Sequence, residues 1–168
     1  TTSCIASRLS SITISFGHDL GNHSEHHKHM PQLSTGGMCD ELNSVTEKVK
    51  SLTGVTMCLF RPPYGDYDNN LIVQAKNCGY YTIQWNVDSL DWKNYGVDSI
   101  VNTVLNHKDL KNGSIILMHN GAKYTAEALP KVIEGLKEKG YEIVPISKLI
   151  YKDNFHMEHD GSQVSDKK

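Results

Sequence analysis

Histidine is concentrated in one short segment of the chain. GHDLGNHSEHHKHM, residues 17–30, holds five histidines, one aspartate and one glutamate. Neutral imidazole is a good ligand for zinc. If HSEHH (23–27) turns helically, His23 and His27 share a face and can reach one ion, whereas His26 points elsewhere. Taken alone, the segment fits a metal site and a solvated histidine-rich surface equally well.

RPPYG (61–65) is a second candidate for chemistry. Its two prolines stiffen a loop that directly follows an apolar strand pattern. The rigid backbone would aim the Arg61 guanidinium, whose planar fork suits a carboxylate. The backbone N–H of Tyr64, next to the turn at Gly65, is a candidate donor to an oxyanion. A loop packed by a salt bridge would account for the same residues without any chemistry.

Two further clusters follow later strand patterns. DSLDW (88–92) offers two carboxylates and an indole, so that one carboxylate could orient a histidine and the indole could floor a sugar-binding groove. LMH (117–119) places a lone histidine, His119, at the end of the most apolar strand pattern. Taken singly, DSLDW also fits a turn with a buried tryptophan, and a lone histidine is more often structural than catalytic.

Short apolar strand patterns alternate with amphipathic helical patterns along the chain. We expect strands within 55–60, 80–85, 114–119 and 142–146, and helices around 42–52, 68–78, 97–105 and 129–136, with a short helix near Ser147. Strand followed by helix, repeated, predicts a parallel α/β sheet or barrel with its functional side chains at the carboxyl ends of the strands. The polar clusters follow strands in this way, which predicts a single site.

Composition excludes several classes of protein. The chain of 168 residues carries 17 Lys and Arg against 19 Asp and Glu, so charge favours neither nucleic acid nor an anionic membrane as a partner. No apolar run is long enough to span a bilayer, and the first residues do not form a signal peptide. The four cysteines contain no CxxC pair, so we expect no thiolate zinc site and favour four free thiols over disulfides.

The chain is short enough for one domain. We expect an atypical N-terminal segment at 1–16, one domain at 17–150, and a polar tail at 151–168 that frays.

Taken in order, HSEHH, RPPYG, DSLDW and LMH resemble four of the five motifs of the NodB-type polysaccharide deacetylases, carbohydrate esterase family 4. The resemblance covers about residues 17–150, and GHDLGNHS and GSIILMHNG look more narrowly like the sporulation-associated deacetylases of Gram-positive spore formers. It implies a distorted (β/α) barrel and metal-assisted hydrolysis of N-acetyl groups on amino-sugar polymers, either peptidoglycan or a chitin-like chain. It also implies an exported protein of the cell wall or spore.

Carried over residue by residue, the resemblance implies that His23 and His27 bind zinc or another divalent ion such as cobalt. The ion would activate a water molecule and polarise the acetyl carbonyl, while the Tyr64 N–H would help to hold the oxyanion. His119 would act as the general acid that protonates the departing amine, with Asp88 fixing its tautomer.

Three further residues take roles from the resemblance. Arg61 corresponds to the arginine that orients the general base in the family, and Trp92 and Leu117 would line the pocket for the acetyl group and the sugar.

The family's first motif, Thr-Phe-Asp-Asp-Gly, does not occur in the 22 residues before His23. In the family its first aspartate is the base and its second is the third metal ligand. We therefore expect a barrel that is incomplete at the N-terminus, weak metal binding with Asp19, His18 or Glu25 as a makeshift third ligand, and turnover reduced by roughly 10²- to 10⁴-fold. Exposed sheet edges would favour a homodimer.

Two other functions remain open. A non-catalytic carbohydrate- or cell-wall-binding relic would keep Tyr64 and Trp92 without the chemistry, although binding alone needs no acid such as His119. A histidine-rich metal-sequestering protein would leave RPPYG and DSLDW unexplained. Carbohydrate binding that survives chelation, with no acetate released, would distinguish the binding protein from the enzyme.

Overall fold

The structure is a computed structural model that describes residues 13–167. Most of the expected N-terminal segment, with Cys4, lies outside the described residues, and residues 13–15 are helical although SITISF alternates like a strand. The contacts divide the chain into two compact units where the sequence suggested one domain. The first unit runs to Gln84 and resumes at Pro145, and the second is Trp85–Val144.

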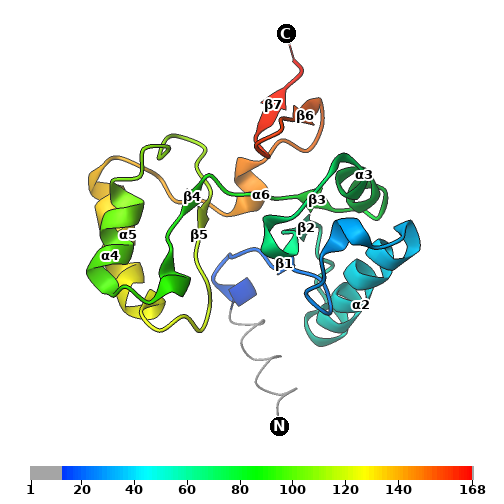
Figure 1. Cartoon of the computed structure of the whole chain (residues 1–168), viewed down its shortest axis with the longest axis horizontal. Helices are drawn as coiled ribbons and strands as arrows, with labels where there is room; N and C mark the ends of the chain where they lie inside the picture. The colour runs from blue at the N-terminus through cyan, green and yellow to red at the C-terminus, as the bar shows by residue number, and fades with distance from the viewer. Residues whose placement is uncertain (1–12, 168) are drawn as a thin grey trace. The chain divides into compact units, whose positions relative to one another are not determined.

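The first unit contains a parallel three-stranded sheet and two helices (Figure 1). The strands lie in the order β1 (Gly21–Asn22), β2 (Leu59–Phe60) and β3 (Tyr81–Thr82), and the helices are α2 (Thr35–Thr53) and α3 (Asn69–Asn77). Single turns of 3₁₀ helix follow β1 and β2, at η1 (Met30–Gln32) and η2 (Pro63–Gly65).

Local sequence explains where these helices begin and end. The Ser34 side chain accepts the N–H of Gly37 at the start of α2, and the Asp68 side chain accepts the N–H of Leu71 at the start of α3. Helix α2 stops at Gly54, whose φ of 76° suits glycine. The helices and sheet enclose a core of buried side chains: Met30, Met38, Leu42, Phe60, Leu71, Ala75 and Tyr80.

The second unit has its own core. Its parallel strands are β4 (Val87–Asp88) and β5 (Ile116–Leu117), its helices are α4 (Val97–Leu105) and α5 (Thr125–Glu138), and a 3₁₀ turn, η3 (Asp91–Lys93), follows β4 (Figure 1). Gly135 lets α5 approach α4 closely, because a Cβ there would lie 2.4 Å from Leu105 Cδ1. The buried residues of this core are Val87, Ile100, Val104, Ala128, Val132 and Leu136.

The strands expected within 55–60, 80–85 and 114–119 and the four expected helices are confirmed, with parallel pairing, but β1 and β4 were not expected and β4 follows β3 without a helix between them. Near the C-terminus, the short helix expected near Ser147 is confirmed, but two other predictions are wrong. The strand expected at 142–146 does not form, since Ile143 is exposed and Pro145 instead precedes the short helix α6 (Ile146–Leu149). The tail does not fray throughout. It forms an antiparallel hairpin of β6 (Phe155–Met157) and β7 (Gln163–Ser165), and the Tyr67 hydroxyl donates a hydrogen bond to the His159 carbonyl within the same unit.

The prediction of four free thiols is also wrong. Cys39 on α2 and Cys78 at the end of α3 form a disulfide, while Cys58 is free and exposed. The packing of α2 against α3 brings the two Cα atoms to 6.2 Å, a normal separation for a disulfide. Sequence spacing does not reveal such a pairing, because it depends on how two helices pack.

No helix within residues 13–167 combines the length and apolar character that crossing a membrane requires.

Candidate functional site

His23 and His27 lie side by side just after β1. Their ring centroids are 4.8 Å apart and the rings are nearly perpendicular, with an interplanar angle of 74°. The turn that brings them together is a bend and not the helical turn on which the predicted pairing was based. Ser24 and His27 both adopt left-handed backbone angles, with φ of 65° and 52°, and the Ser24 hydroxyl accepts the His27 N–H at 2.9 Å.

The orientation of the His23 ring suits a metal ligand. Its Nδ1 lies 2.7 Å from the carbonyl oxygen of Arg61. Because a carbonyl only accepts hydrogen bonds, Nδ1 carries the hydrogen, and in the neutral ring Nε2 keeps the lone pair that a metal needs. The Arg61 N–H in turn donates to the Asn22 carbonyl at 2.9 Å, so the pairing of β1 with β2 fixes both partners.

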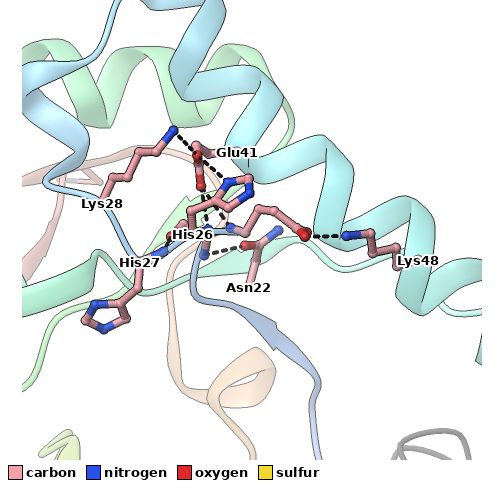
Figure 2. Close-up of polar contacts among 8 residues, drawn as sticks. Asn22, His26, His27, Lys28, Glu41 and Lys48 are labelled. Atoms are coloured by element: carbon pink, nitrogen blue, oxygen red, sulfur yellow. Dashed lines mark hydrogen bonds and ion pairs between the residues drawn. The ribbon is translucent and has the colours of Figure 1, made fainter. Parts of the chain in front are cut away.

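Glu41 on α2 holds the segment of residues 23–28, here called the histidine loop, and is almost fully buried (Figure 2). Its Oε2 accepts the backbone N–H groups of Glu25 (3.1 Å) and His26 (2.8 Å). Its Oε1 contacts His26 Nδ1 and Lys28 Nζ, each at 2.9 Å. His26 therefore points away from the pair, as its spacing predicted.

The ionisation of Glu41 reflects this environment. Burial works to raise the pKa of the carboxyl group, but the hydrogen bonds from Lys28 and His26 and the charge of Lys28 outweigh it. Together they lower the pKa from 4.5 to about 2. Glu41 is thus an anion at neutral pH.

The described residues supply only part of a metal site. Two imidazoles with an oriented nitrogen fit zinc chemistry, but no group of three His, Cys, Asp or Glu side chains suited to an ion occurs within residues 13–167. Two of the makeshift third ligands have other partners. The Asp19 carboxylate accepts the N–H and hydroxyl of Ser147 at 2.7 and 2.8 Å, and Glu25 pairs with Lys48.

RPPYG forms the turn η2, which presents Tyr64 beside the histidines. Tyr64 has a left-handed backbone (φ 62°) and an exposed ring that lies edge-on to His27 at 4.6 Å and stacks on His29 at 4.2 Å. His29 also bonds Asp66 at 3.0 Å. Burial lowers the pKa of the Arg61 guanidinium. Sequence reasoning assigned no role to His29, and only its place in the histidine-rich segment marked it.

In the second unit, Asp91 orients His119, not Asp88. One oxygen of Asp91 lies 2.7 Å from His119 Nδ1 and the other accepts the His119 N–H at 2.6 Å. The expected partner, Asp88, instead accepts the N–H of Leu90 at 2.9 Å. Leu90 has a left-handed backbone, φ 55°, so the turn after β4 directs the two carboxylates differently.

Asp91 is fully buried and also accepts the Thr125 hydroxyl at 2.6 Å. Burial works to raise the pKa of Asp91, but the hydrogen bonds from His119 and Thr125 outweigh it and the pKa is lowered. The ionised carboxylate keeps a hydrogen on His119 Nδ1 and leaves Nε2 for proton transfer. Thr125, which opens α5, is a residue that sequence reasoning missed.

The two expected pocket residues of this unit differ in exposure. Trp92 in η3 is about half exposed, and Lys93 Nζ lies 5.1 Å from the centre of its ring. Leu117 is buried and pairs in register with Asp88. Their contact with a substrate stays a prediction.

The comparisons with known proteins all point to the same family. The sequence model for polysaccharide deacetylases matches residues 12–83. The chain is 33% identical to the peptidoglycan-N-acetylmuramic acid deacetylase PdaA of Bacillus subtilis, over 84% of this chain and 54% of that protein. A family 4 carbohydrate esterase from Streptomyces lividans, solved with acetate, is 33% identical with a TM-score of 0.74, over 82% of this chain and 70% of the other.

A second similar structure is a pseudoenzyme of carbohydrate esterase family 4 from Bacillus anthracis. It is 31% identical with a TM-score of 0.78, and the match covers 85% of this chain and 50% of the other. The chain spans about half the length of the curated relatives that it matches.

Proposed function

The chain belongs to the polysaccharide deacetylases of carbohydrate esterase family 4, with their NodB-type α/β fold, and we propose that it provides a metal-dependent N-deacetylase for amino-sugar polysaccharides. The observation that carries the proposal is the His23–His27 pair, with rings 4.8 Å apart and the His23 ring oriented by the contact of its Nδ1 with the Arg61 carbonyl. We assign these two imidazoles to zinc or a similar ion such as cobalt. When bound, the ion supplies Lewis-acid polarisation of an acetyl carbonyl and activation of water.

The first unit's own residues supply binding and charge stabilisation in this proposal. Tyr64 has a left-handed backbone in the turn η2, and we assign its N–H as a donor to the developing oxyanion. Arg61, whose backbone N–H is fixed by the Asn22 carbonyl, contributes a cationic guanidinium whose planar fork suits a carboxylate.

The second unit supplies a proton donor. His119, held through Nδ1 by Asp91, gives a proton from Nε2 to the amine nitrogen as the amide C–N bond breaks. Asp91 replaces Asp88 in the positioning role, and Trp92 and Leu117 keep the proposed role of contacting the sugar and its acetyl group. The ring of Trp92 is exposed enough to stack on a sugar.

We infer the substrate class from relatives. Several are named peptidoglycan deacetylases, acting on N-acetylmuramic acid or N-acetylglucosamine. The Cys39–Cys78 disulfide supports action in an oxidising compartment such as the cell wall or spore. A role in sporulation and a homodimeric state are further proposals, which spore phenotype and sedimentation analysis test.

The proposal is tested with purified chain, by zinc titration followed in a calorimeter and by acetate release from chitooligosaccharides and peptidoglycan fragments. We expect one zinc ion per chain, lost in His27→Ala, and acetate release that a chelator abolishes. Zinc binding that is unchanged in His27→Ala would overturn the metal assignment.

A second candidate is a non-catalytic carbohydrate-binding domain. The absence of a three-ligand group within residues 13–167 favours it, and a pseudoenzyme is among the similar structures. It predicts binding of chitooligosaccharides that survives chelation, is weakened by Trp92→Ala, and is accompanied by no acetate release.

A further inference from the structure

We propose that Glu41 is the positioning residue of the His23–His27 pair: its buried carboxylate holds the loop that brings the two imidazoles together. In its consequence for metal affinity, the inference rests on the function proposed above. Its consequence for the ring geometry does not require a metal.

The contacts of Glu41 account for the backbone of the loop between the two histidines. A carboxylate only accepts hydrogen bonds, and Glu41 uses Oε2 for the consecutive N–H groups of residues 25 and 26. These N–H groups have no helical carbonyl to bind, because the segment forms a bend and not a helix. Oε1 receives the His26 ring and Lys28, so one side chain from α2 makes four contacts with residues 25, 26 and 28 (Figure 2).

The loop needs such an anchor, because its conformation is strained. Ser24 and His27 have positive φ angles, which non-glycine residues adopt at a cost. Four contacts to a buried, charged acceptor, two of them from the backbone between these residues, offset that strain. Without these contacts, the turn that brings the His23 and His27 rings together is no longer held in place.

A second contact from α2 secures the start of the loop. Asn22, which is 1% exposed, donates to the Leu42 carbonyl at 2.7 Å and to the Thr46 hydroxyl at 3.2 Å, and its side-chain oxygen accepts the Ser24 N–H at 2.9 Å. Helix α2 therefore binds the chain on both sides of Ser24, at Asn22 before it and through Glu41 after it. Between the two histidines Asn22 reaches only Ser24, whereas Glu41 binds the backbone of both residue 25 and residue 26.

Glu41 itself does no chemistry in this proposal. It is 5% exposed, and both of its oxygens are engaged by the loop. It acts through the residues that it holds, as the hydrogen-bonded supports of metal ligands generally do.

The experiment compares Glu41→Gln with Glu47→Gln, which makes the same charge change at an exposed position of α2. In Glu41→Gln an amide group replaces one oxygen and faces either the two backbone N–H groups or the His26 and Lys28 donors. The first readout is the NOE between ring protons of His23 and His27 in the metal-free protein. We expect it in the wild type and in Glu47→Gln, and its loss in Glu41→Gln.

The second readout is zinc or cobalt affinity by calorimetry. We expect a decrease of about 10- to 100-fold in Glu41→Gln, no change in Glu47→Gln, and partial recovery in Glu41→Asp, which restores the carboxylate. Ile72→Ala, a destabilising change on α3, separates positioning from stability, because it should lower the melting temperature without changing the NOE.

The outcomes distinguish this inference from the proposed function. A folded Glu41→Gln protein that keeps the NOE overturns the inference, even if the wild type binds zinc tightly. A wild type that binds no metal but loses the NOE in Glu41→Gln supports the positioning role and overturns the metal site. If Glu41→Gln does not fold, Lys28→Met removes one contact at the surface and should weaken the NOE, and an unchanged NOE overturns the inference.

Discussion

Asp88 and Asp91 are three positions apart in one short motif, yet their surroundings differ. Asp91 is buried and receives hydrogen bonds from the His119 backbone, the His119 ring and Thr125, whereas Asp88 receives one from the nearby Leu90 N–H. At the scale of single residues, the number of hydrogen-bond donors and the burial of the carboxylate therefore determine which aspartate contributes more to stability.

The Asp91→Asn substitution tests this difference. We expect the free energy of unfolding to fall by about 1.5–3 kcal/mol, because the amide cannot accept from all three donors and leaves a buried one unsatisfied. Asp88→Asn, the matched control, should lower it by less than about 1 kcal/mol. Urea denaturation of both variants provides the measurement, and equal losses would contradict the assignment.

Glu41 gives a second prediction at this scale, for the effect of pH. Its pKa is about 2 in the folded protein against 4.5 for the ordinary group. Because the folded value is the lower one, ionised Glu41 stabilises the protein fully above about pH 4.5, and this stabilisation is lost as the pH falls toward 2. The shift corresponds to a loss on the order of 3 kcal/mol.

Urea denaturation between pH 5 and pH 2 checks this prediction. The difference in unfolding free energy between wild type and Glu41→Gln should shrink steadily over that range. Glu47→Gln should follow the wild type in parallel, and a constant gap for Glu41→Gln would show that its carboxyl group is not perturbed.

At the scale of elements, α2 has two partners. Its buried face packs in the first unit's core, and Glu41 and the carbonyl of Leu42 bind the histidine loop. Its Cys39 is joined to the end of α3 across 39 residues of sequence. The position of α2 thus affects both the core and the candidate metal pair.

Removing this disulfide should destabilise the first unit. For Cys39→Ser combined with Cys78→Ser we expect a loss of about 2–4 kcal/mol, because the unfolded chain regains the entropy of an open loop. Thermal unfolding followed by circular dichroism measures the effect. Cys58→Ser is the control, since Cys58 is free, and a melting temperature that reducing agent leaves unchanged in the wild type would count against the disulfide.

At the scale of the whole molecule, the residues proposed for binding and for proton transfer belong to different compact units of the chain. The candidate metal ligands and oxyanion donor belong to the first, and the candidate acid with its buried aspartate belongs to the second. Such a division predicts that binding and turnover respond to different substitutions.

His119→Ala should lower acetate release by about 10²- to 10⁴-fold and leave zinc affinity within about two-fold of the wild type. His23→Ala should lower both. Calorimetry and an acetate assay on the same preparations provide the comparison, and a large loss of zinc affinity in His119→Ala would contradict the separate roles.

The sequence by itself determined the helices α2 to α5, the strands β2, β3 and β5, and the motifs that hold the candidate functional residues. Local rules suffice there, because caps such as Ser34 and Asp68, the stop at Gly54, and apolar periodicity act within a few residues. The motifs also identified His23, His27 and His119 as candidates, since residue type and order carry that information.

Only the tertiary structure decided the partners of those residues. The left-handed backbone at Leu90 directs Asp91, and not Asp88, toward His119. In the sequence, Glu41 could not be distinguished from any other charged residue on a helix. The Cys39–Cys78 bond and the unpaired stretch at 142–146 likewise depend on which elements pack together. Contacts between residues far apart in the chain depend on how the helices and strands pack, and local sequence patterns do not specify that packing.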